Sequence, residues 1–372
     1  MADLSVEVCG LRFRNPILPA AGPPGRDGAA LVACAAGGAG GLVTKTVSVR
    51  PAEVPAPNMA EVPHGMLNAE LWSELPVERW LEREYALART TSLPLVVSLG
   101  YSPADVAALG PLVRPFADAV ELSTHYVGED PAPMVDAIRA AKRVLTVPVL
   151  VKLSPLGRDM ARAAVLARDA GADGIVAINS FGPCLAIDLE TGLPRLGGPG
   201  GYGWLSGPAI KPLAVRCVLD IARAVELPIV GVGGVSRGVD AVELLMAGAS
   251  AVGVCTAAIL RGPAVFGRIA AELGAWLDAH GYGSVAEIQG LALRRAWPSG
   301  ALAAPVVDPG RCNGCGLCET SCVYDAIHVV ERTAILDEAR CTVCGLCVTR
   351  CRPDALRWPA LHEVGAAAAA GR

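Results

Sequence analysis

Short apolar runs alternate with longer mixed stretches along roughly the first 290 residues of the chain. Eight of these runs are rich in Val, Ile and Leu and are bounded by Gly, Pro or Ser, a pattern typical of parallel strands buried on both faces. The predicted strands are Ile17–Gly22, Gly41–Val47, Leu93–Gly100, Ala119–Thr124, Val147–Ser154, Gly174–Ser180, Pro228–Val235 and Ala251–Thr256. Eight strand–helix units in about 250 residues predict an α/β fold of the (β/α)8 TIM-barrel type, rather than an open doubly wound sheet of five or six strands.

The stretches between the strands predict helices, and other local signals support the same architecture. Helices are expected at Val77–Arg89, Pro103–Val113, Pro131–Arg143, Arg158–Ala170, Ala209–Val225 and Arg237–Met246. Gly171 and Gly248, each within an Ala-Gly-Ala sequence, are suited to end a helix just before the next strand. At the N-terminus, Leu4–Val8 and Leu11–Arg14 are expected to form a hairpin that covers the floor of the barrel.

Composition excludes several classes of protein. The chain has 372 residues, 52% of them apolar, and a net charge of −4 without a basic run, so it lacks the clustered positive face of a nucleic-acid-binding protein. No apolar stretch reaches the roughly 18 residues that a membrane span needs, and Met1–Glu7 carries acidic residues where a signal peptide needs cationic ones. We therefore expect a cytoplasmic protein that binds neither nucleic acid nor membrane.

The cysteines are concentrated near the C-terminus, where eight of the 13 fall between Cys312 and Cys351. They form two runs with the same Cys-x2-Cys-x2-Cys-x3-Cys spacing, and aligning Cys312–Ile327 with Cys341–Leu356 gives nine identities in 16 positions. Such clustering in a cytoplasmic chain indicates metal binding rather than disulfides. Two structural zinc sites would need only paired Cys-x2-Cys motifs, whereas the third cysteine in each tight run favours two [4Fe–4S] clusters.

The cysteine module resembles the bacterial two-cluster ferredoxins over residues 311–353, although the Pro that usually follows the fourth cysteine is absent from both halves. In such modules the fourth cysteine of each run binds the other cluster. The spacing therefore predicts one cluster on Cys312, Cys315, Cys318 and Cys351 and the other on Cys322, Cys341, Cys344 and Cys347. The predicted organisation is a barrel over residues 1–296, a Pro- and Gly-rich linker over 297–310, a ferredoxin-like domain over 311–358 and a flexible tail over 359–372.

Candidate ligand-binding positions lie at the carboxyl ends of the predicted strands, where (β/α)8 barrels bind their ligands. Gly231–Gly234 ends the seventh strand, and glycines let backbone N–H groups approach phosphate oxygens. Lys45 and Lys152 end the second and fifth strands inside apolar runs, so each needs an anionic or electron-rich partner, unless its side chain extends to the rim of the barrel. The glycine spacing does not match a dinucleotide-binding loop, so we do not expect the chain itself to bind NAD.

Several segments together resemble the dihydroorotate dehydrogenases and the flavin-binding part of dihydropyrimidine dehydrogenase. They are Asn15-Pro16, Ala20–Gly22, Thr44–Thr46, Val151–Ser154, Ala177–Ser180, Leu205–Arg216 and Gly231–Gly234. The segment Leu67–Glu74 (Leu-Asn-Ala-Glu-Leu-Trp-Ser-Glu) is more similar to the dihydropyrimidine branch than to the dihydroorotate branch. With the barrel first and the two-cluster module last, the chain to about residue 357 resembles the catalytic subunits of bacterial NAD-dependent dihydropyrimidine dehydrogenases.

The resemblance implies that FMN binds in the mouth of the barrel. The cofactor-binding residues that it implies are Ala21, Gly22, Lys45, Thr46, Lys152, Asn179, Gly207, Gly233, Gly234, Cys255 and Thr256. Lys152 would lie by the N1/O2 edge of the flavin, where a fixed cation stabilises developing negative charge. The substrate, a small polar ring such as a pyrimidine, is expected to be bound by Asn68, Glu70, Ser123, Asn179 and Ser180.

The chain departs from the family pattern at the end of the fourth strand. The family has Glu-Leu-Asn-Leu-Ser-Cys-Pro there, with the cysteine (serine in some members) as acid/base, whereas this chain has Glu121-Leu-Ser-Thr-His-Tyr-Val127. Ser123 replaces the substrate-binding Asn, and Tyr126 replaces the cysteine. Tyr126, His125 and Cys184 are the candidates for proton transfer, with ring stacking for Tyr126, a place on the rim for His125 and simple packing for Cys184 as the alternatives.

These observations predict an FMN- and iron–sulfur-dependent oxidoreductase acting on a CH–CH or C=C bond of a small polar ring, a dihydropyrimidine of the uracil or thymine type or dihydroorotate. FMN would exchange a hydride with the substrate and pass electrons singly through the clusters. Because no NAD site is visible, the expected electron partner is a FAD/NAD-binding subunit or a soluble ferredoxin, and we expect an oligomer. Two alternatives stay open: the same cofactors with another unsaturated cyclic or enoyl substrate, and an electron-transfer subunit with an inactive barrel.

Overall fold

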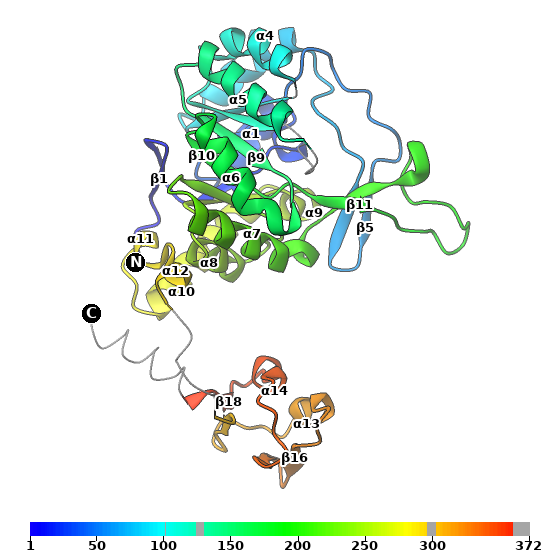
Figure 1. The fold of residues 1–372 in the computed structure, drawn as a ribbon, viewed down its shortest axis with the longest axis vertical. Helices are drawn as coiled ribbons and strands as arrows, with labels where there is room; N and C mark the ends of the chain where they lie inside the picture. The colour runs from blue at the N-terminus through cyan, green and yellow to red at the C-terminus, as the bar shows by residue number, and fades with distance from the viewer. Residues whose placement is uncertain (101, 124–129, 296–302, 360–372) are drawn as a thin grey trace. The chain divides into compact units, whose positions relative to one another are not determined.

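The computed structural model describes residues 1–100, 102–123, 130–295 and 303–359 (Figure 1). The chain forms two compact units, Met1–Arg295 and Ala296–Arg372, each with its own apolar core. Among the described residues, no helix has both the length and the apolar character needed to cross a lipid bilayer.

The first unit contains one eight-stranded parallel sheet that curves into a nearly closed barrel. In sheet order its strands are β3 (Ile17–Pro19), β14 (Ala251–Val254), β13 (Ile229–Val232), β10 (Gly174–Ala177), β9 (Val149–Leu153), β8 (Ala119–Ser123), β7 (Leu95–Leu99) and β4 (Leu42–Val43). The two strands at the ends of this order, β3 and β4, contact each other. Each of the eight predicted strands contains one of these strands, so the predicted TIM barrel is confirmed.

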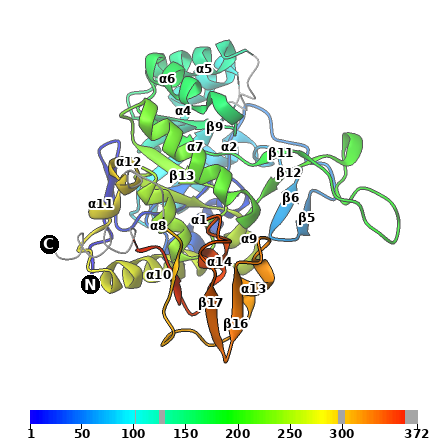
Figure 2. The ribbon, with the colours of Figure 1, turned by 60° about the horizontal axis from the view of Figure 1, so that its bottom comes forward.

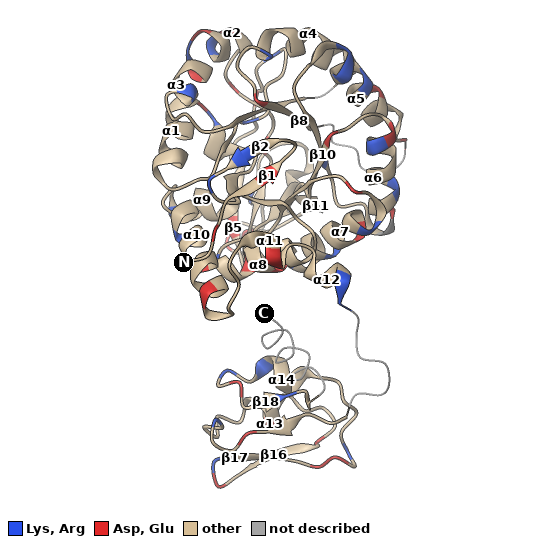
Figure 3. Cartoon of the chain, turned by 90° about the vertical axis from the view of Figure 1, so that its left-hand side faces the viewer, with Lys and Arg blue, Asp and Glu red and all other residues tan. Residues whose placement is uncertain are grey.

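Helices surround this sheet as a ring (Figure 3). They are α1 (Gly28–Ala36), α2 (Val77–Arg79), α3 (Tyr85–Arg89), α4 (Pro103–Val113), α5 (Ala132–Val144), α6 (Met160–Asp169), α7 (Lys211–Ala224), α8 (Gly238–Met246), α9 (Thr256–Arg261), α10 (Val265–Ala279), α11 (Val285–Ile288) and α12 (Leu291–Arg294). Short helical turns lie at η1 (Pro23–Gly25), η3 (Gly157–Asp159), η4 (Pro199–Gly201) and η5 (Pro208–Ile210). The helix predicted at Val77–Arg89 is interrupted by the π-helical turn η2 (Trp80–Glu84), where Trp80 packs on Tyr85 with ring centroids 5.3 Å apart.

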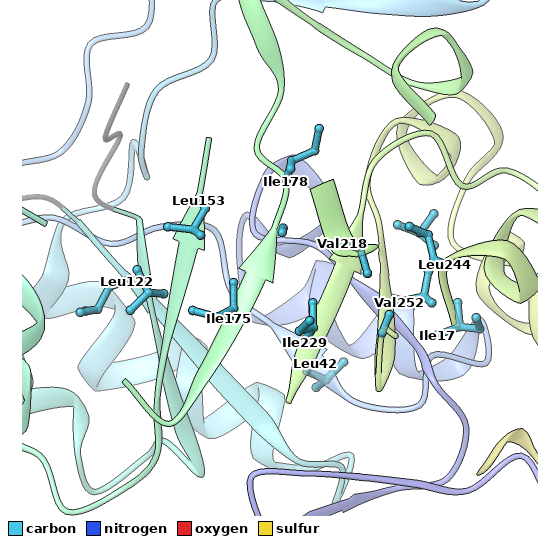
Figure 4. Packing of buried hydrophobic residues seen from close by; sticks show 14 of the residues in the cluster. Ile17, Leu42, Leu122, Leu153, Ile175, Ile178, Val218, Ile229, Leu244 and Val252 are labelled. Carbon is cyan, nitrogen blue, oxygen red and sulfur yellow. The ribbon is translucent and has the colours of Figure 1, made fainter. Parts of the chain in front are cut away.

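The alternation of side chains along each strand builds two apolar layers. On β8, Val120 and Leu122 point outward into the layer between the strands and the helices, whereas Ala119 points into the barrel. Figure 4 shows part of the outer layer, in which Val218 of α7 and Leu244 of α8 lie beside strand residues. The inner layer is filled by apolar side chains from successive strands: Leu18, Val43, Val96, Ala119, Leu150, Val176, Val230 and Ala251.

The predicted N-terminal hairpin is also present, as β1 (Val6–Val8) paired antiparallel with β2 (Leu11–Phe13). Figure 3 shows the hairpin across the centre of the barrel. Val8 and Phe13 are buried against the inner layer, next to side chains such as Ala119 and Leu150 from the amino-terminal ends of their strands. The hairpin therefore closes the end of the barrel opposite to the one where ligands bind.

A second, four-stranded antiparallel sheet was not predicted. Its order is β11 (Phe181–Cys184), β12 (Gly203–Ser206), β6 (Gly65–Asn68) and β5 (Met59–Val62), and Figure 2 shows the four strands together. The pairing of Trp204 with Asn68 joins two segments that follow different barrel strands. Short strands with glycines and no regular alternation carry little local signal, so this sheet depends on pairing between distant segments.

The second unit is a small module built around its cysteines. It contains α13 (Leu317–Ser321), α14 (Leu346–Arg350) and two antiparallel pairs, β15 (Val306–Val307) with β18 (Leu356–Arg357) and β16 (Ile327–Val330) with β17 (Thr333–Leu336). Cys318, Ile327, Ala334 and Leu356 form its core. Because β15 lies within the predicted linker 297–310, part of that segment belongs to the module instead.

Candidate active site

A cavity opens at the carboxyl ends of the barrel strands, with about 1150 Å³ of empty space including its mouth. Seven barrel strands, or the residues directly after them, supply its walls, and β6 and β12 of the second sheet add Asn68 and Trp204. Backbone and side chains from both sheets therefore converge on one hollow at the end of the barrel where ligands bind.

All eleven residues predicted to bind a cofactor line this cavity. They are Ala21, Gly22, Lys45, Thr46, Lys152, Asn179, Gly207, Gly233, Gly234, Cys255 and Thr256. Gly233 and Gly234 have φ of +132° and +79°, and a Cβ at these positions would come within 2.7 Å of Ala214 Cβ and 2.5 Å of Lys211 Cβ. Only glycine suits such positions, so the wall is bare backbone where a phosphate would need close approach.

Lys152 is buried in the wall, and its contacts with oxygens of the described residues are long. Its Nζ lies 3.7 Å from Glu121 Oε1 and 3.5 Å from the carbonyl oxygen of Ala21. Burial raises the pKa of Glu121, and the nearby Lys152 ammonium partly opposes that rise. An ammonium normally makes hydrogen bonds of about 2.7–2.9 Å to anionic oxygens, so Lys152 retains the capacity to bind an anionic or electron-rich group in the cavity.

Lys45, by contrast, is fully engaged by the protein's own carboxylates. Its Nζ donates to Glu70 Oε2 at 2.6 Å and to both carboxylate oxygens of Glu74 at 2.9 and 2.8 Å. Asn58 Nδ2 donates to the other oxygen of Glu70. Both lysines are buried, at 3% and 6% exposure, so neither extends to the rim of the barrel. The Glu70–Lys45–Glu74 group carries a formal net charge of −1 at the edge of the cavity.

The residues predicted to bind substrate also line the cavity: Asn68, Glu70, Ser123, Asn179 and Ser180. Asn68 Nδ2 donates to the carbonyl oxygen of Trp204 at 3.0 Å, so the second sheet orients this amide. Asn179 Oδ1 accepts the backbone N–H of Ser180 at 2.9 Å. Fixed amides of this kind are suited to orient the N–H and C=O groups of a polar ring.

Sequence reasoning missed several lining residues. Trp72, Trp204, Ser154 and Ser206 also line the cavity, and Thr256 Oγ1 donates to Ser206 Oγ at 2.9 Å. Ser206 lies within the segment Leu205–Arg216, and Trp204 directly precedes it. Trp72 lies within the segment Leu67–Glu74. These segments were thus identified from the sequence, but these positions were not identified as part of the site. The tryptophans supply flat apolar surface on which a planar ring can stack.

Of the three candidates for proton transfer, the structure describes one, Cys184. His125 and Tyr126 lie outside the described residues. Cys184 is at the end of β11 and is not among the residues that line the cavity. A different thiol, Cys255, does line it, but burial raises its pKa to about 11, with Lys152 lowering it in part. Cys255 is therefore protonated near neutral pH, which makes it a poor general base.

The cysteine module contains two small cavities, each lined by four cysteines. One is lined by Cys312, Cys315, Cys318 and Cys351. The other is lined by Cys322, Cys341, Cys344 and Cys347. Each set combines the three closely spaced cysteines of one run with the fourth cysteine of the other run. Each cavity thus gathers the four cysteines that the sequence analysis assigns to one cluster.

A (β/α)8 barrel with a glycine-walled cavity and a cysteine module of this layout is the architecture of an oxidoreductase that carries an iron–sulfur centre. A family model described as dihydroorotate dehydrogenase matches residues 3–277, and one described as a 4Fe-4S binding domain matches residues 304–327. The chain belongs to the dihydroorotate dehydrogenase family, whose members are oxidoreductases that act on CH–CH groups and use FMN.

Individual relatives are similar over more than three quarters of the chain. The chain is 40% identical over 301 residues to the catalytic subunit of dihydroorotate dehydrogenase B (NAD(+)) from Methanothermobacter thermautotrophicus, covering 78% of this chain and 98% of that protein. The corresponding subunits from Pyrococcus abyssi and Geobacter sulfurreducens are 37% and 36% identical over 302 and 303 residues, or 78% and 77% of this chain and 99% and 97% of theirs. The unmatched part of this chain has about the length of the cysteine module.

Proposed function

We propose that the chain is the catalytic part of an FMN-dependent iron–sulfur oxidoreductase that acts on the CH–CH or C=C bond of a small polar ring. The observation that carries the proposal is the cavity in which the residues predicted for cofactor and ring meet around a buried, incompletely bonded Lys152. When bound, FMN supplies the capacity to exchange a hydride with the substrate. Gly207, Gly233 and Gly234 would hold it through their backbone, and Lys152 would face its electron-accepting edge.

With Lys152 facing FMN, the charged group that is left at the edge of the cavity favours an uncharged ring of the dihydrouracil or dihydrothymine type over dihydroorotate. Glu70 already binds Lys45, and the group that these two form with Glu74 has a formal net charge of −1. The carboxylate of dihydroorotate would meet this negative charge, whereas dihydropyrimidines without a carboxylate would not. The names of the relatives support dihydroorotate instead. An experiment therefore has to compare the two types of ring as substrates.

We expect the flavin of the FMN-loaded protein to bleach under argon on addition of dihydrouracil or dihydrothymine, and at least tenfold more slowly with dihydroorotate. The reason is the repulsion between the net negative Glu70–Lys45–Glu74 group and a substrate carboxylate. Absorbance near the flavin band measures the rate for each ring. Faster bleaching by dihydroorotate would identify dihydroorotate rather than an uncharged dihydropyrimidine as the substrate and would leave the rest of the proposed function unchanged. No bleaching by any such ring would favour an electron-transfer subunit with an inactive barrel or a different unsaturated substrate.

The proton that must leave or reach the ring is assigned to the segment after β8. Ser123 at the end of β8 lines the cavity, and His125 and Tyr126 follow it by two and three residues. Tyr126 is proposed as the acid/base, with His125 and Cys184 as the other candidates. We expect Tyr126→Phe to slow turnover by about 10²–10⁴-fold with little change in FMN affinity. An unchanged rate would move the role to His125 or Cys184, and the corresponding His125→Asn and Cys184→Ala variants would separate these two.

Electrons are proposed to leave through two [4Fe–4S] clusters in the cysteine module, of which one motif is matched at residues 304–327. The second cluster is supported by the second cavity lined by four cysteines. The relatives are named as catalytic subunits of NAD(+)-linked enzymes, which supports a separate FAD/NAD-binding subunit as the electron partner, with a soluble ferredoxin as the alternative. Cytoplasmic location and oligomer formation stay predictions from sequence.

A further inference from the structure

Glu121 is a buried carboxylate inside the barrel with no role in the proposed chemistry. On β8 it shares the inward face with Ala119 and Ser123, and it is 3% exposed. Toward the amino-terminal end of the strands lies the apolar inner layer that contains Ala119 and Leu150. Toward the carboxyl end lies the cavity lined by Ser123 and Lys152. A charge in such a place costs free energy, so its presence calls for an explanation.

The hydrogen bonds around Glu121 leave one of its oxygens without a partner. Among the described residues, Oε1 has no hydrogen bond, and Lys152 Nζ is 3.7 Å away. The register between β7 and β8 places Ser98 opposite Glu121, but Ser98 Oγ shares a hydrogen bond of 2.9 Å with Thr46 Oγ1. Glu121 therefore depends on the Lys152 ammonium for electrostatic compensation.

The Lys152 ammonium lies between the Glu121 carboxylate and the cavity. From inside the barrel it faces Glu121, and from the cavity side it is available to a bound ligand. Its contacts of 3.5 and 3.7 Å to protein oxygens are too long for strong hydrogen bonds. A negative charge that appears on a ligand in the cavity would attract the ammonium, while the Glu121 carboxylate would offset part of its positive charge.

We propose that Glu121 is a positioning residue that holds the Lys152 ammonium at the cavity wall and lowers the positive charge that FMN experiences. The inference rests on the proposed function, because it requires FMN in this cavity. It makes Glu121 a determinant of the reduction potential: its charge makes the flavin harder to reduce than Lys152 alone would.

The test compares flavin reduction potentials in the full-length, FMN-loaded protein. Glu121→Gln removes the charge and retains the shape, so we expect reduced FMN to be favoured by about tenfold more than in the wild type, a positive shift of about 30 mV for a two-electron couple. Glu121→Asp keeps the charge and should shift the potential much less. The same order should appear in the ratio of the dissociation constants of reduced and oxidised FMN.

Glu84→Gln is the matched control, because Glu84 is also buried, at 2% exposure, and is paired with Arg79 at 2.9 Å, but it does not line the cavity. Its potential should equal that of the wild type. A Glu121→Gln potential that equals those of wild type and control, or shifts negative, overturns the inference and leaves the proposed function intact. An equal shift in Glu121→Asp and Glu121→Gln would show that packing rather than charge is responsible, and would also overturn it. A wild-type chain that takes up no FMN overturns the proposed function and this inference together.

Discussion

Replacing Lys152 with Met is expected to lower kcat/KM by about a hundredfold or more, which is the usual cost of removing one fixed group that stabilises developing negative charge. Lys152 is the residue with the clearest unused bonding capacity in the cavity wall, since its protein contacts are 3.5 and 3.7 Å long. Methionine retains much of the aliphatic length of lysine without its charge. Steady-state kinetics with the best ring from the substrate screen measures the loss, and flavin absorbance after desalting measures retention of FMN.

The same substitution should also destabilise the barrel, because it leaves Glu121 buried without its cation. Removing one member of a buried pair typically costs about 3–5 kcal/mol. The double variant Lys152→Met/Glu121→Gln removes both charges, so we expect it to recover most of the unfolding free energy but none of the turnover. Denaturant unfolding and kinetics on the same three proteins separate the two effects. A double variant with restored turnover would contradict the role of Lys152.

The stability loss in Lys152→Met should depend on pH with a definite sign. Burial raises the pKa of Glu121, and the variant lacks the ammonium that opposes this rise. In the unfolded chain the carboxyl releases its proton near pH 4.3. Above that pH the folded state holds more protons than the unfolded state, so the free energy of unfolding falls as the pH rises toward the folded pKa. Unfolding curves at pH 5 and pH 8 should therefore show a larger deficit at pH 8.

The second large effect concerns the iron content of the cysteine module. In crossed ligation the fourth cysteine of each run binds the cluster of the other run, whereas in sequential ligation all four cysteines of a run bind one cluster. If Cys351 completes the cluster of Cys312, Cys315 and Cys318, the double variant Cys312→Ser/Cys351→Ser should lose one cluster, about four of about eight irons per chain. The double variant Cys312→Ser/Cys322→Ser should then lose ligands from both clusters and retain little iron. Sequential ligation predicts the reverse order of iron contents.

Iron and acid-labile sulfide assays on anaerobically purified protein measure the outcome, with electron paramagnetic resonance of the reduced protein as a second readout. Cys217→Ser is the control, because Cys217 is fully buried in α7 of the barrel and lines neither cysteine cavity. Its iron content should equal that of the wild type. Because metal binding contributes to the folding of small metal domains, we also expect the second unit to become protease-sensitive when both clusters are lost.

Much of the candidate site could be predicted because the relevant signals are local. A barrel strand such as Val149–Leu153 is recognisable from its own apolar residues, and the position of Lys152 within it places that ammonium at the carboxyl end. The glycines at 233 and 234 similarly mark bare backbone after β13. The second sheet was missed, because β6 and β12 acquire strand structure by pairing with each other and with β5 and β11. The place of Trp204 in the cavity was missed with it.

The sequence by itself determined the barrel, its floor hairpin and the cysteine spacing, because strand periodicity and ligand spacing are properties of contiguous residues. Only the tertiary structure decided which charges meet. The register of β8 and β9 pairs Ser123 with Lys152, which leaves Glu121, two residues earlier on the same face of β8, diagonal to Lys152. The loop after β6 brings Glu70 and Glu74 to Lys45. Such pairs depend on strand register and on burial from water. Both arise from contacts between segments that are distant in the sequence, so the periodicity of the residues does not predict them.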